Sequence, residues 1–321
     1  MTAQKIYEFS GTTKQELLIL EKYLQKKDYS KDTIYQYYNY AGLFVEYLTE
    51  QDIEPELVNY PVIKDFIFQL KKDKSIRHIN RILTGIKHYY ASLRIGINPA
   101  ADLRIRGERR GMQHHFIELE ELEEVYRNYL GLDERTKRNK AILGLLVYQG
   151  LTTRELHQLE EKNIKLREGK IYIKGSKNSN GRTLNLEACQ LLDLQEYLLM
   201  VRPRMLENLE TGKYREKSGR KPKSIDPKIY EQVFFSEGGS ANIKTSLYHM
   251  FRAIEKLNPV LTSGKIIRAA VISNWLKRYD IRIVQYMAGH RYVSSTEKYD
   301  IMNLEELMEG CLLYTSPSPR D

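Results

Sequence analysis

The stretch MAGHRYVSSTEKYD, residues 287–300, places a helix end, a turn and a helix start close together. Apolar residues at helical spacing precede it, and Gly289 is suited to end that helix because glycine adopts the left-handed conformation cheaply. Ser294 and Glu297 form an S-x-x-E pattern, which predicts a capping box at the start of a new helix. The stretch therefore predicts two helices joined by a tight turn.

This turn brings two reactive side chains toward one place. His290 would end the first helix, and Tyr299 would lie in the first turns of the second. A buried structural histidine and a core tyrosine would explain this stretch alone equally well. The two readings have to be separated by the rest of the chain.

Composition narrows the class of protein. The 321 residues suit two domains, and 51 Lys and Arg against 42 Asp and Glu give a formal charge of +9. Such an excess favours a polyanionic partner, with nucleic acid first and an anionic membrane second. The two cysteines lie far apart, and neither a signal-like start nor a membrane-length apolar run is present. We expect a soluble cytoplasmic protein without a disulfide framework or zinc site.

The first 96 residues predict a four-helix unit. Leu17, Leu20 and Leu24 share one helix face, and Ser30 is a candidate cap for the next helix. The predicted helices cover residues 13–24, 30–48, 62–70 and 75–93.

Residues 97–115 break the helical pattern with glycine and proline and concentrate positive charge. This segment carries Arg104, Arg106, Arg109 and Arg110. We interpret it as a basic linker between domains that contacts a phosphate backbone, with a solvated loop as the alternative.

Residues 116–310 predict a second domain that is mainly α-helical with one small β-hairpin. Ile171 and Ile173 alternate with polar residues, a turn-rich segment follows, and Leu184 and Leu186 alternate again. The stretch 202–224 is rich in Lys and Arg and predicts a flexible basic loop. Residues 311–321 fit neither domain, and we treat them as a non-native tail.

Cations precede the opening stretch at a characteristic spacing. Lys265 and Arg268 are three residues apart, which puts both on one face of a helix near its start. His290 follows about twenty residues later, and Tyr299 nine residues after that. The combination is far more specific than any of its parts.

With these residues the chain resembles the tyrosine recombinases, or phage-type integrases, over nearly its whole length. The matching motifs are GLTTREL, a hairpin lysine (Lys177 or its competitor Lys174), KIIR, GH and Tyr299. The resemblance implies a two-domain DNA clamp, with a core-binding domain at 1–96 and a catalytic domain at 116–310.

The resemblance also implies roles for these residues. Tyr299 would attack a phosphodiester and form a 3′-phosphotyrosyl link, which keeps the bond energy and requires no metal or nucleotide cofactor. Arg268 would bind a non-bridging oxygen, and the hairpin lysine would protonate the leaving 5′ oxygen. Lys265 stands where the family has His or Lys. His290, with an ordinary pKa near ~6.5, would orient the phosphate or accept a proton.

One position departs from the family pattern. Its first arginine falls at Thr152, which carries no charge, and Arg154 would point to the opposite side of a helix. We expect Lys177 or Arg182 of the hairpin to supply the missing charge. The alternative is a catalytically impaired relative that acts as an accessory or regulatory DNA-binding factor.

The implied partner is double-stranded DNA with a pseudo-palindromic site. A homodimer would bind one site, and a homotetramer would form the synaptic complex. The protein would act at the nucleoid of a bacterial cell, with no membrane partner.

Overall fold

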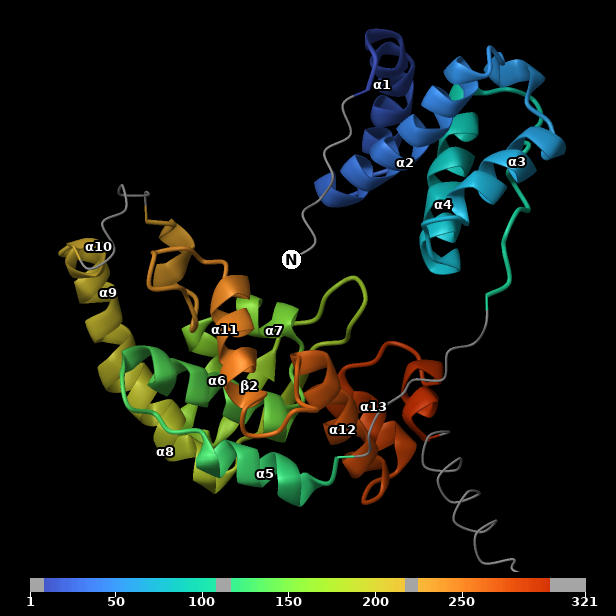
Figure 1. The fold of residues 1–321 in the computed structure, drawn as a ribbon. Coiled ribbons are helices and arrows are strands. Elements are labelled where there is room, and N and C mark those ends of the chain that lie inside the picture. Colours follow the sequence, from blue (N-terminus) through green and yellow to red (C-terminus); the bar gives the residue numbers. More distant parts are fainter. Residues whose placement is uncertain (1–8, 108–116, 217–224, 301–321) are drawn as a thin grey trace, which may run out of the picture. The chain divides into compact units, whose positions relative to one another are not determined.

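A computed structural model describes residues 9–107, 117–216 and 225–300. The chain forms two compact units, residues 1–111 and 112–321, which are considered separately here (Figure 1). Among the residues described, no helix is long and apolar enough to cross a membrane.

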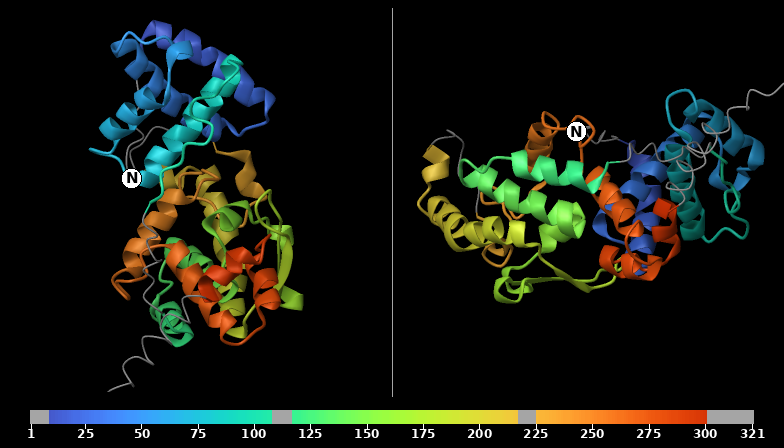
Figure 2. Two further views of the ribbon diagram at one scale, coloured as in Figure 1. Left: turned by 90° about the vertical axis from the view of Figure 1, so that its right-hand side faces the viewer. Right: turned by 90° about the horizontal axis from the view of Figure 1, so that it is seen from below.

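Four helices build the N-terminal unit, as predicted. They are α1 (Gly11–Lys26), α2 (Lys31–Glu50), α3 (Tyr60–Leu70) and α4 (Ile76–Leu93), with a 3-10 turn η1 (Pro55–Leu57) between α2 and α3 (Figure 2). Each α-helix begins where a side-chain oxygen accepts a hydrogen bond from a backbone N–H of the first turn. The capping residues are Ser10, Ser30, Asn59 and Ser75.

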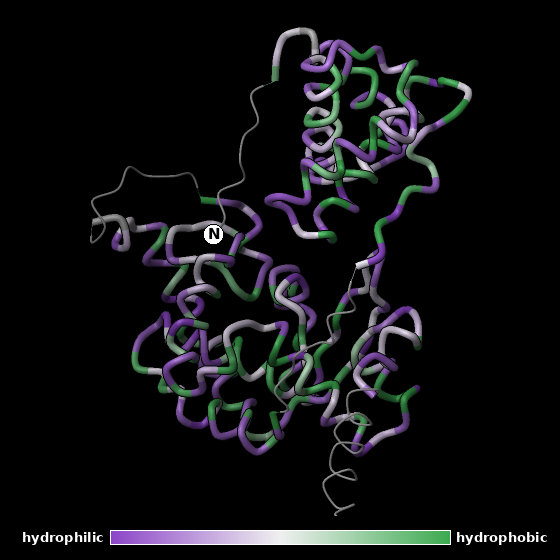
Figure 3. Tube along the Cα trace, turned by 45° about the vertical axis from the view of Figure 1, so that its right-hand side comes forward, coloured by the Kyte–Doolittle hydropathy of each residue, from purple (hydrophilic) through white to green (hydrophobic). Residues whose placement is uncertain are grey.

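The core of this unit follows the helical periodicity of the sequence. Leu17, Leu20 and Leu24 are fully buried, as are Phe44 and Leu48 on α2. Apolar and polar positions alternate along these helices in the hydropathy-coloured trace (Figure 3). The predicted four-helix unit is therefore confirmed.

The segment after α4 belongs to the N-terminal unit over much of its length. Ala100 is fully buried, and Leu103 packs against the core. The side chain of Asn80 bonds both the carbonyl and the N–H of Ile105, at 2.9 and 3.0 Å. The predicted 97–115 linker is thus wrong for its first part, because alternate apolar residues anchor this part to α4.

The arginines of that segment separate into two groups. Arg104 and Arg106 are exposed, on alternate positions to the packed apolar residues. Arg109 and Arg110 lie outside the described residues, as does the tail 311–321.

The C-terminal unit is mainly helical with one small sheet, which confirms the predicted fold class. Its α-helices are α5 (Leu119–Asn128), α6 (Glu134–Gln149), α7 (Thr153–Gln158), α8 (Ala188–Glu196), α9 (Arg202–Glu210), α10 (Lys213–Glu216), α11 (Lys244–Ile254), α12 (Gly264–Leu276) and α13 (Ile281–Ala288). Shorter turns are η2 (Glu161–Asn163), η3 (Leu166–Glu168), the π-helical η4 (Tyr197–Val201) and η5 (Pro227–Tyr230). Residues 294–300 are helical as well.

The sheet is antiparallel in the order β1 (Ile164–Lys165), β2 (Lys170–Ile173) and β3 (Arg182–Asn185). The predicted hairpin is β2–β3, and the two-residue β1 adds an edge strand that the sequence did not predict. Ile173 pairs with Arg182, and both side chains are buried. An arginine therefore occupies an inward position of this sheet.

The predicted flexible loop at 202–224 is wrong for residues 202–210 and 213–216, which form α9 and α10. Arg202, Met205 and Leu209 are buried at helical spacing. The guanidinium of Arg202 donates to the carbonyls of Ile229 and Tyr230, at 3.2 and 2.8 Å. The basic composition of this stretch suggested a loop, but Arg202 is a buried structural cation of a helix. Residues 217–224 are outside the described part.

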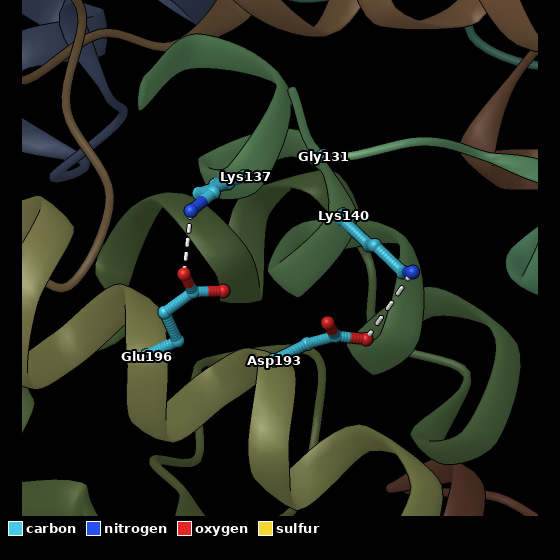
Figure 4. A pocket seen from close by; sticks show the side chains of 5 residues that line it. All are labelled: Gly131, Lys137, Lys140, Asp193 and Glu196. Atoms are coloured by element: carbon cyan, nitrogen blue, oxygen red, sulfur yellow. Dashed lines mark hydrogen bonds and ion pairs between the residues drawn. The ribbon is translucent and has the colours of Figure 1, made fainter. Parts of the chain in front are cut away.

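Ion pairs join α6 to α8 in a small polar pocket (Figure 4). Lys137 lies 2.5 Å from Glu196, and Lys140 lies 3.7 Å from Asp193. The charges of each ion pair neutralise one another, and the two pairs link α6 to α8. α6 also packs against α5 and α12. The C-terminal end of α6 and helix α12 both contribute to the site described below.

We predict that Gly85→Ala destabilises the protein. An open helix gains roughly 1 kcal/mol from this change, but a Cβ at Gly85 would lie 2.7 Å from the Tyr40 Cβ and 3.2 Å from the Tyr37 carbonyl oxygen. These atoms belong to the α2 backbone or adjoin it, and they cannot rotate away. Overpacking of about 1–3 kcal/mol should win, which urea denaturation followed by circular dichroism would detect.

The matched control is Gly11→Ala, where nothing lies within 4 Å. This variant should be as stable as the wild type or more so. A Gly85→Ala protein more stable than the wild type would show that α2 and α4 do not pack this closely.

Candidate active site

Arg268 is held by the C-terminal ends of two helices. Its Nη2 donates to the Ala288 carbonyl at 2.6 Å, and its Nη1 donates to the Gly150 carbonyl. Gly150 and Gly289 end α6 and α13 with φ of +56° and +67°. Helix C-termini carry unpaired carbonyls and partial negative charge, so both ends favour a cation at this point. Burial lowers the pKa of Arg268 from its ordinary value, and the guanidinium remains charged at neutral pH.

His290 bridges Arg268 and the following helix. Its Nε2 lies 3.3 Å from Arg268 Nη2, and its Nδ1 lies 2.9 Å from Thr296 Oγ1. A guanidinium only donates, so Nε2 accepts and the ring proton is on Nδ1, which donates to Thr296. Thr296 is fully buried and was not expected from the sequence.

The imidazole of His290 is neutral at physiological pH. Burial first, and then the nearby charge of Arg268, lower its pKa to about 4. The sequence predicted an ordinary pKa of ~6.5 for His290. The structure corrects that expectation, because a protonated ring would face a guanidinium at hydrogen-bonding distance.

Tyr299 lies beside His290. The ring centroids are 6.0 Å apart with planes at 11°, and Tyr299 packs against the small core of Ile272, Val284 and Ala288. The predicted meeting of imidazole and phenol is thus observed. The helix that carries Tyr299 begins differently from the prediction, since the Glu297 N–H bonds the Val293 carbonyl at 3.0 Å. Val293 therefore takes the cap position expected for Ser294.

Glu155 connects two guanidiniums. Its Oε1 accepts from Arg182 Nη1 at 2.6 Å, and its Oε2 lies 3.9 Å from Arg268 Nη1. The N–H and hydroxyl of Thr152 donate to Oε2 at 2.8 and 2.9 Å. Burial alone would raise the pKa of this carboxyl, but the hydrogen bond and charge of Arg182 hold it below its usual range. We name Arg182, Arg268, Glu155, His290 and Tyr299 the Arg268 cluster.

The hairpin is fixed to the turn that carries His290. The Asn180 N–H donates to the Gly289 carbonyl at 3.0 Å, and Arg291 donates to the Lys177 carbonyl at 2.8 Å. A Cβ at Gly289 would collide with the guanidinium of Arg182. Gly289 is thus required both for its left-handed backbone and for the space that it leaves.

Four of the sequence candidates lie outside this cluster. Lys177, Lys174, Lys265 and Arg154 are exposed. Across residues 117–216 and 225–300, no side-chain hydrogen bond or ion pair joins any of them to the cluster. Lys174 instead lies near enough to Glu160 to lower the pKa of that carboxyl, after the larger effects of Lys162. Arg154 is exposed on α7, whereas its neighbour Glu155 is buried. The helix angle expected between Thr152 and Arg154 does not apply, because Thr152 is the extended cap residue before α7.

Sequence reasoning found Arg268, His290 and Tyr299, named Arg182 as an alternative, and missed the central role of Glu155. The position of Glu155 in the GLTTREL motif, in the first turn of α7, was the sequence feature that could have indicated this role. Two guanidiniums, one carboxylate and a neutral imidazole form a donor-rich, positively charged group. Such a group suits an anion such as phosphate.

Comparisons with known proteins agree with this chemistry. The chain is 24% identical to tyrosine recombinase XerA of Pyrococcus furiosus, over 90% of each protein. It is 27% identical to tyrosine recombinase XerC of Lactobacillus delbrueckii subsp. bulgaricus, over 71% of this chain and 73% of that protein.

Solved structures share the fold. The XerH recombinase bound to its difH substrate superposes with a TM-score of 0.63 at 15% identity, over 92% of this chain and 95% of XerH. A lambda integrase tetramer bound to a Holliday junction gives 0.59 at 15% identity, over 89% and 76% of the two chains. The sequence profile of the Phage integrase family matches residues 115–305, more than half of the chain, so the protein belongs to the phage integrase family of tyrosine recombinases.

Proposed function

We propose that the protein is a site-specific recombinase that cuts and rejoins duplex DNA through a phosphotyrosyl intermediate on Tyr299. The observation that carries this proposal is the contact chain from Tyr299 to His290 to Arg268, in which an imidazole links a phenol to a partly buried guanidinium. The alternative of an impaired accessory factor rests on Thr152 alone.

The proposed step is an in-line displacement at phosphorus. The Tyr299 oxygen loses its proton to solvent and forms a bond to phosphorus while the bond to the 5′ oxygen of the DNA breaks, and the 3′ phosphate stays on the protein. The reverse reaction with another 5′ hydroxyl rejoins the strands. No external energy source is required, because one phosphodiester replaces another.

Arg268 would neutralise the charge that develops on a non-bridging oxygen. It is pre-ordered by the Ala288 and Gly150 carbonyls, so no reorganisation is required when the phosphate binds. Neutral His290 would keep Arg268 and Tyr299 in register, with its Nε2 accepting from Arg268 and its Nδ1 donating to Thr296. Lys265 lies one turn before Arg268 on α12, where it would reach the same phosphate.

The proton for the leaving oxygen would come from the hairpin. Lys177 and Lys174 are both exposed, and the backbone of Lys177 is anchored by Arg291 beside His290. That anchor favours Lys177 as the general acid, with Lys174 as the competitor.

The proposed partner is a pseudo-palindromic duplex, bound by a homodimer and joined in a homotetramer. The XerH–difH complex and the lambda integrase tetramer on a Holliday junction, whose folds resemble that of this chain, support DNA binding and assembly. Arg104 and Arg106 would contact phosphates, and the cell compartment would be the bacterial nucleoid.

We predict that DNA affinity falls steeply with salt. Each neutralised phosphate contributes roughly −0.9 to the slope of log K against log salt, so the Arg104→Gln/Arg106→Gln variant should flatten the slope by about two such steps. Fluorescence anisotropy on a duplex selected by the protein from a random pool would measure it. Lys137→Gln is the control, since Lys137 is already paired with Glu196. A salt-independent wild type would contradict the phosphate-binding proposal.

We predict that Tyr299→Phe binds the selected duplex with unchanged affinity and forms no covalent adduct. The substitution removes the oxygen that would attack and preserves the ring that packs on His290. Denaturing gel electrophoresis after reaction with a nicked form of that duplex is the measurement. A persisting adduct would move the nucleophile elsewhere, with exposed Tyr292 the next residue to test.

We predict that His290 makes the protein less stable as pH falls from about 6.5 to about 4. The pKa of this imidazole is about 4 when folded and near ~6.5 when unfolded, so the unfolded chain binds more protons in that window. This contribution to stability is fully present above the pKa of the unfolded state and is lost as the pH falls toward the pKa of the folded state. Urea denaturation should show the loss in the wild type and less of it in His290→Asn.

The size of this effect is at most ~1.4 kcal/mol per unit of pKa difference, reduced by the partial exposure of the ring. If the stability of the wild type and of His290→Asn changed with pH in the same way, the imidazole would not be held neutral in the folded protein.

A further inference from the structure

Arg182 is a buried cation to which the proposed reaction gives no direct task. Its side chain is 0% exposed, on the inward face of β3, where Leu184 is its next inward neighbour. Nη1 bonds Glu155, whereas Nε and Nη2 find no acceptor among the residues that the structure describes. A buried charge is costly, and an apolar residue here would continue the pattern of the strand. A stabilising role alone therefore explains Arg182 poorly.

The charges of the cluster suggest what Arg182 does. Glu155 lies within ion-pair distance of both Arg182 and Arg268, at 2.6 and 3.9 Å. Without Arg182, the negative charge of Glu155 would offset the positive charge of Arg268. With Arg182 present, two positive charges and one negative charge leave the group positive. His290 is neutral and adds nothing to this balance.

We infer that Arg182 is a positioning residue for DNA cleavage, which holds Glu155 and offsets its negative charge so that Arg268 acts on the phosphate as a full cation. This inference rests on the proposed function. Arg182 works from beneath the site and does not touch DNA, since its side chain is fully buried.

The neighbouring residues leave this task to Arg182. Thr152 gives Glu155 two neutral hydrogen bonds to Oε2 and no charge. Arg154 and Lys177 are exposed and make no ion pair with Glu155. Gly289 leaves the space that the guanidinium of Arg182 occupies. Of the residues expected to supply the charge missing at Thr152, only Arg182 is in contact with Glu155.

The test is a charge-restoring double variant. Arg182→Met should slow single-turnover cleavage of the nicked duplex by about 100-fold, because Glu155 would then offset Arg268 and weaken the transition-state contact that Arg268 makes. Glu155→Gln/Arg182→Met removes both charges and restores the balance. We expect it to cleave at least tenfold faster than Arg182→Met. DNA affinity should stay within threefold of wild type in both proteins, because neither residue touches DNA.

Two further variants separate charge from folding. Arg182→Lys keeps the charge and should cleave within tenfold of the wild type. Arg167→Met removes an exposed arginine before β2, at the far end of the sheet, and should cleave at the wild-type rate. Thermal melting of each protein shows whether it is folded.

Three outcomes would overturn the inference while the wild type still forms its adduct. One is a folded Arg182→Met that cleaves at the wild-type rate. Another is a folded double variant that cleaves no faster than Arg182→Met. If Arg182→Met does not fold, the corresponding outcome is a folded double variant that cleaves more than 100-fold slower than the wild type. The third is a folded Arg182→Lys that is slower than the double variant. A wild type that forms no adduct would instead reject the proposed function, and this inference with it.

Discussion

The site depends on the hydrogen bonds that Arg268 donates to the ends of α6 and α13. Each of these helices ends at a left-handed glycine, which leaves a carbonyl directed at the guanidinium. The same turn after α13 carries His290 and leads into the helix of Tyr299. One buried cation thus fixes the relative positions of two helix ends and the proposed nucleophile. Its partial burial is tolerated because Nη1 and Nη2 meet acceptors and Glu155 supplies a compensating charge.

The second principle of the site is electrostatic balance. Glu155 holds two guanidiniums that would otherwise repel, and Thr296 and Arg268 together fix His290 in its neutral form with the proton on Nδ1. Both devices are local hydrogen-bonding arrangements within a largely water-excluded space, where interactions between charges are strong. The lysines of the hairpin and Lys265 of α12 are exposed and lie outside this fixed centre.

Much of this could be predicted from the sequence, and the rest could not for physical reasons. Helical periodicity and cap residues located the four N-terminal helices, and the spacing of Arg268, His290 and Tyr299 located the site. Composition misled at Arg202 in α9, which is buried, and at the basic segment around Ala100, which apolar residues anchor to the core. The roles of Glu155, Arg182 and Thr296 depend on contacts between residues distant in the sequence or on hydrogen-bond directions. A pattern along the chain does not carry that information.

The identity of the residue that becomes linked to DNA tests the central claim most directly. The wild-type protein would be trapped on a nicked duplex, digested with trypsin and nuclease, and analysed by mass spectrometry. The account predicts a nucleotide joined through its 3′ phosphate to Tyr299, in the peptide that follows Lys298. A nucleotide on any other residue, or a 5′ linkage, would contradict it.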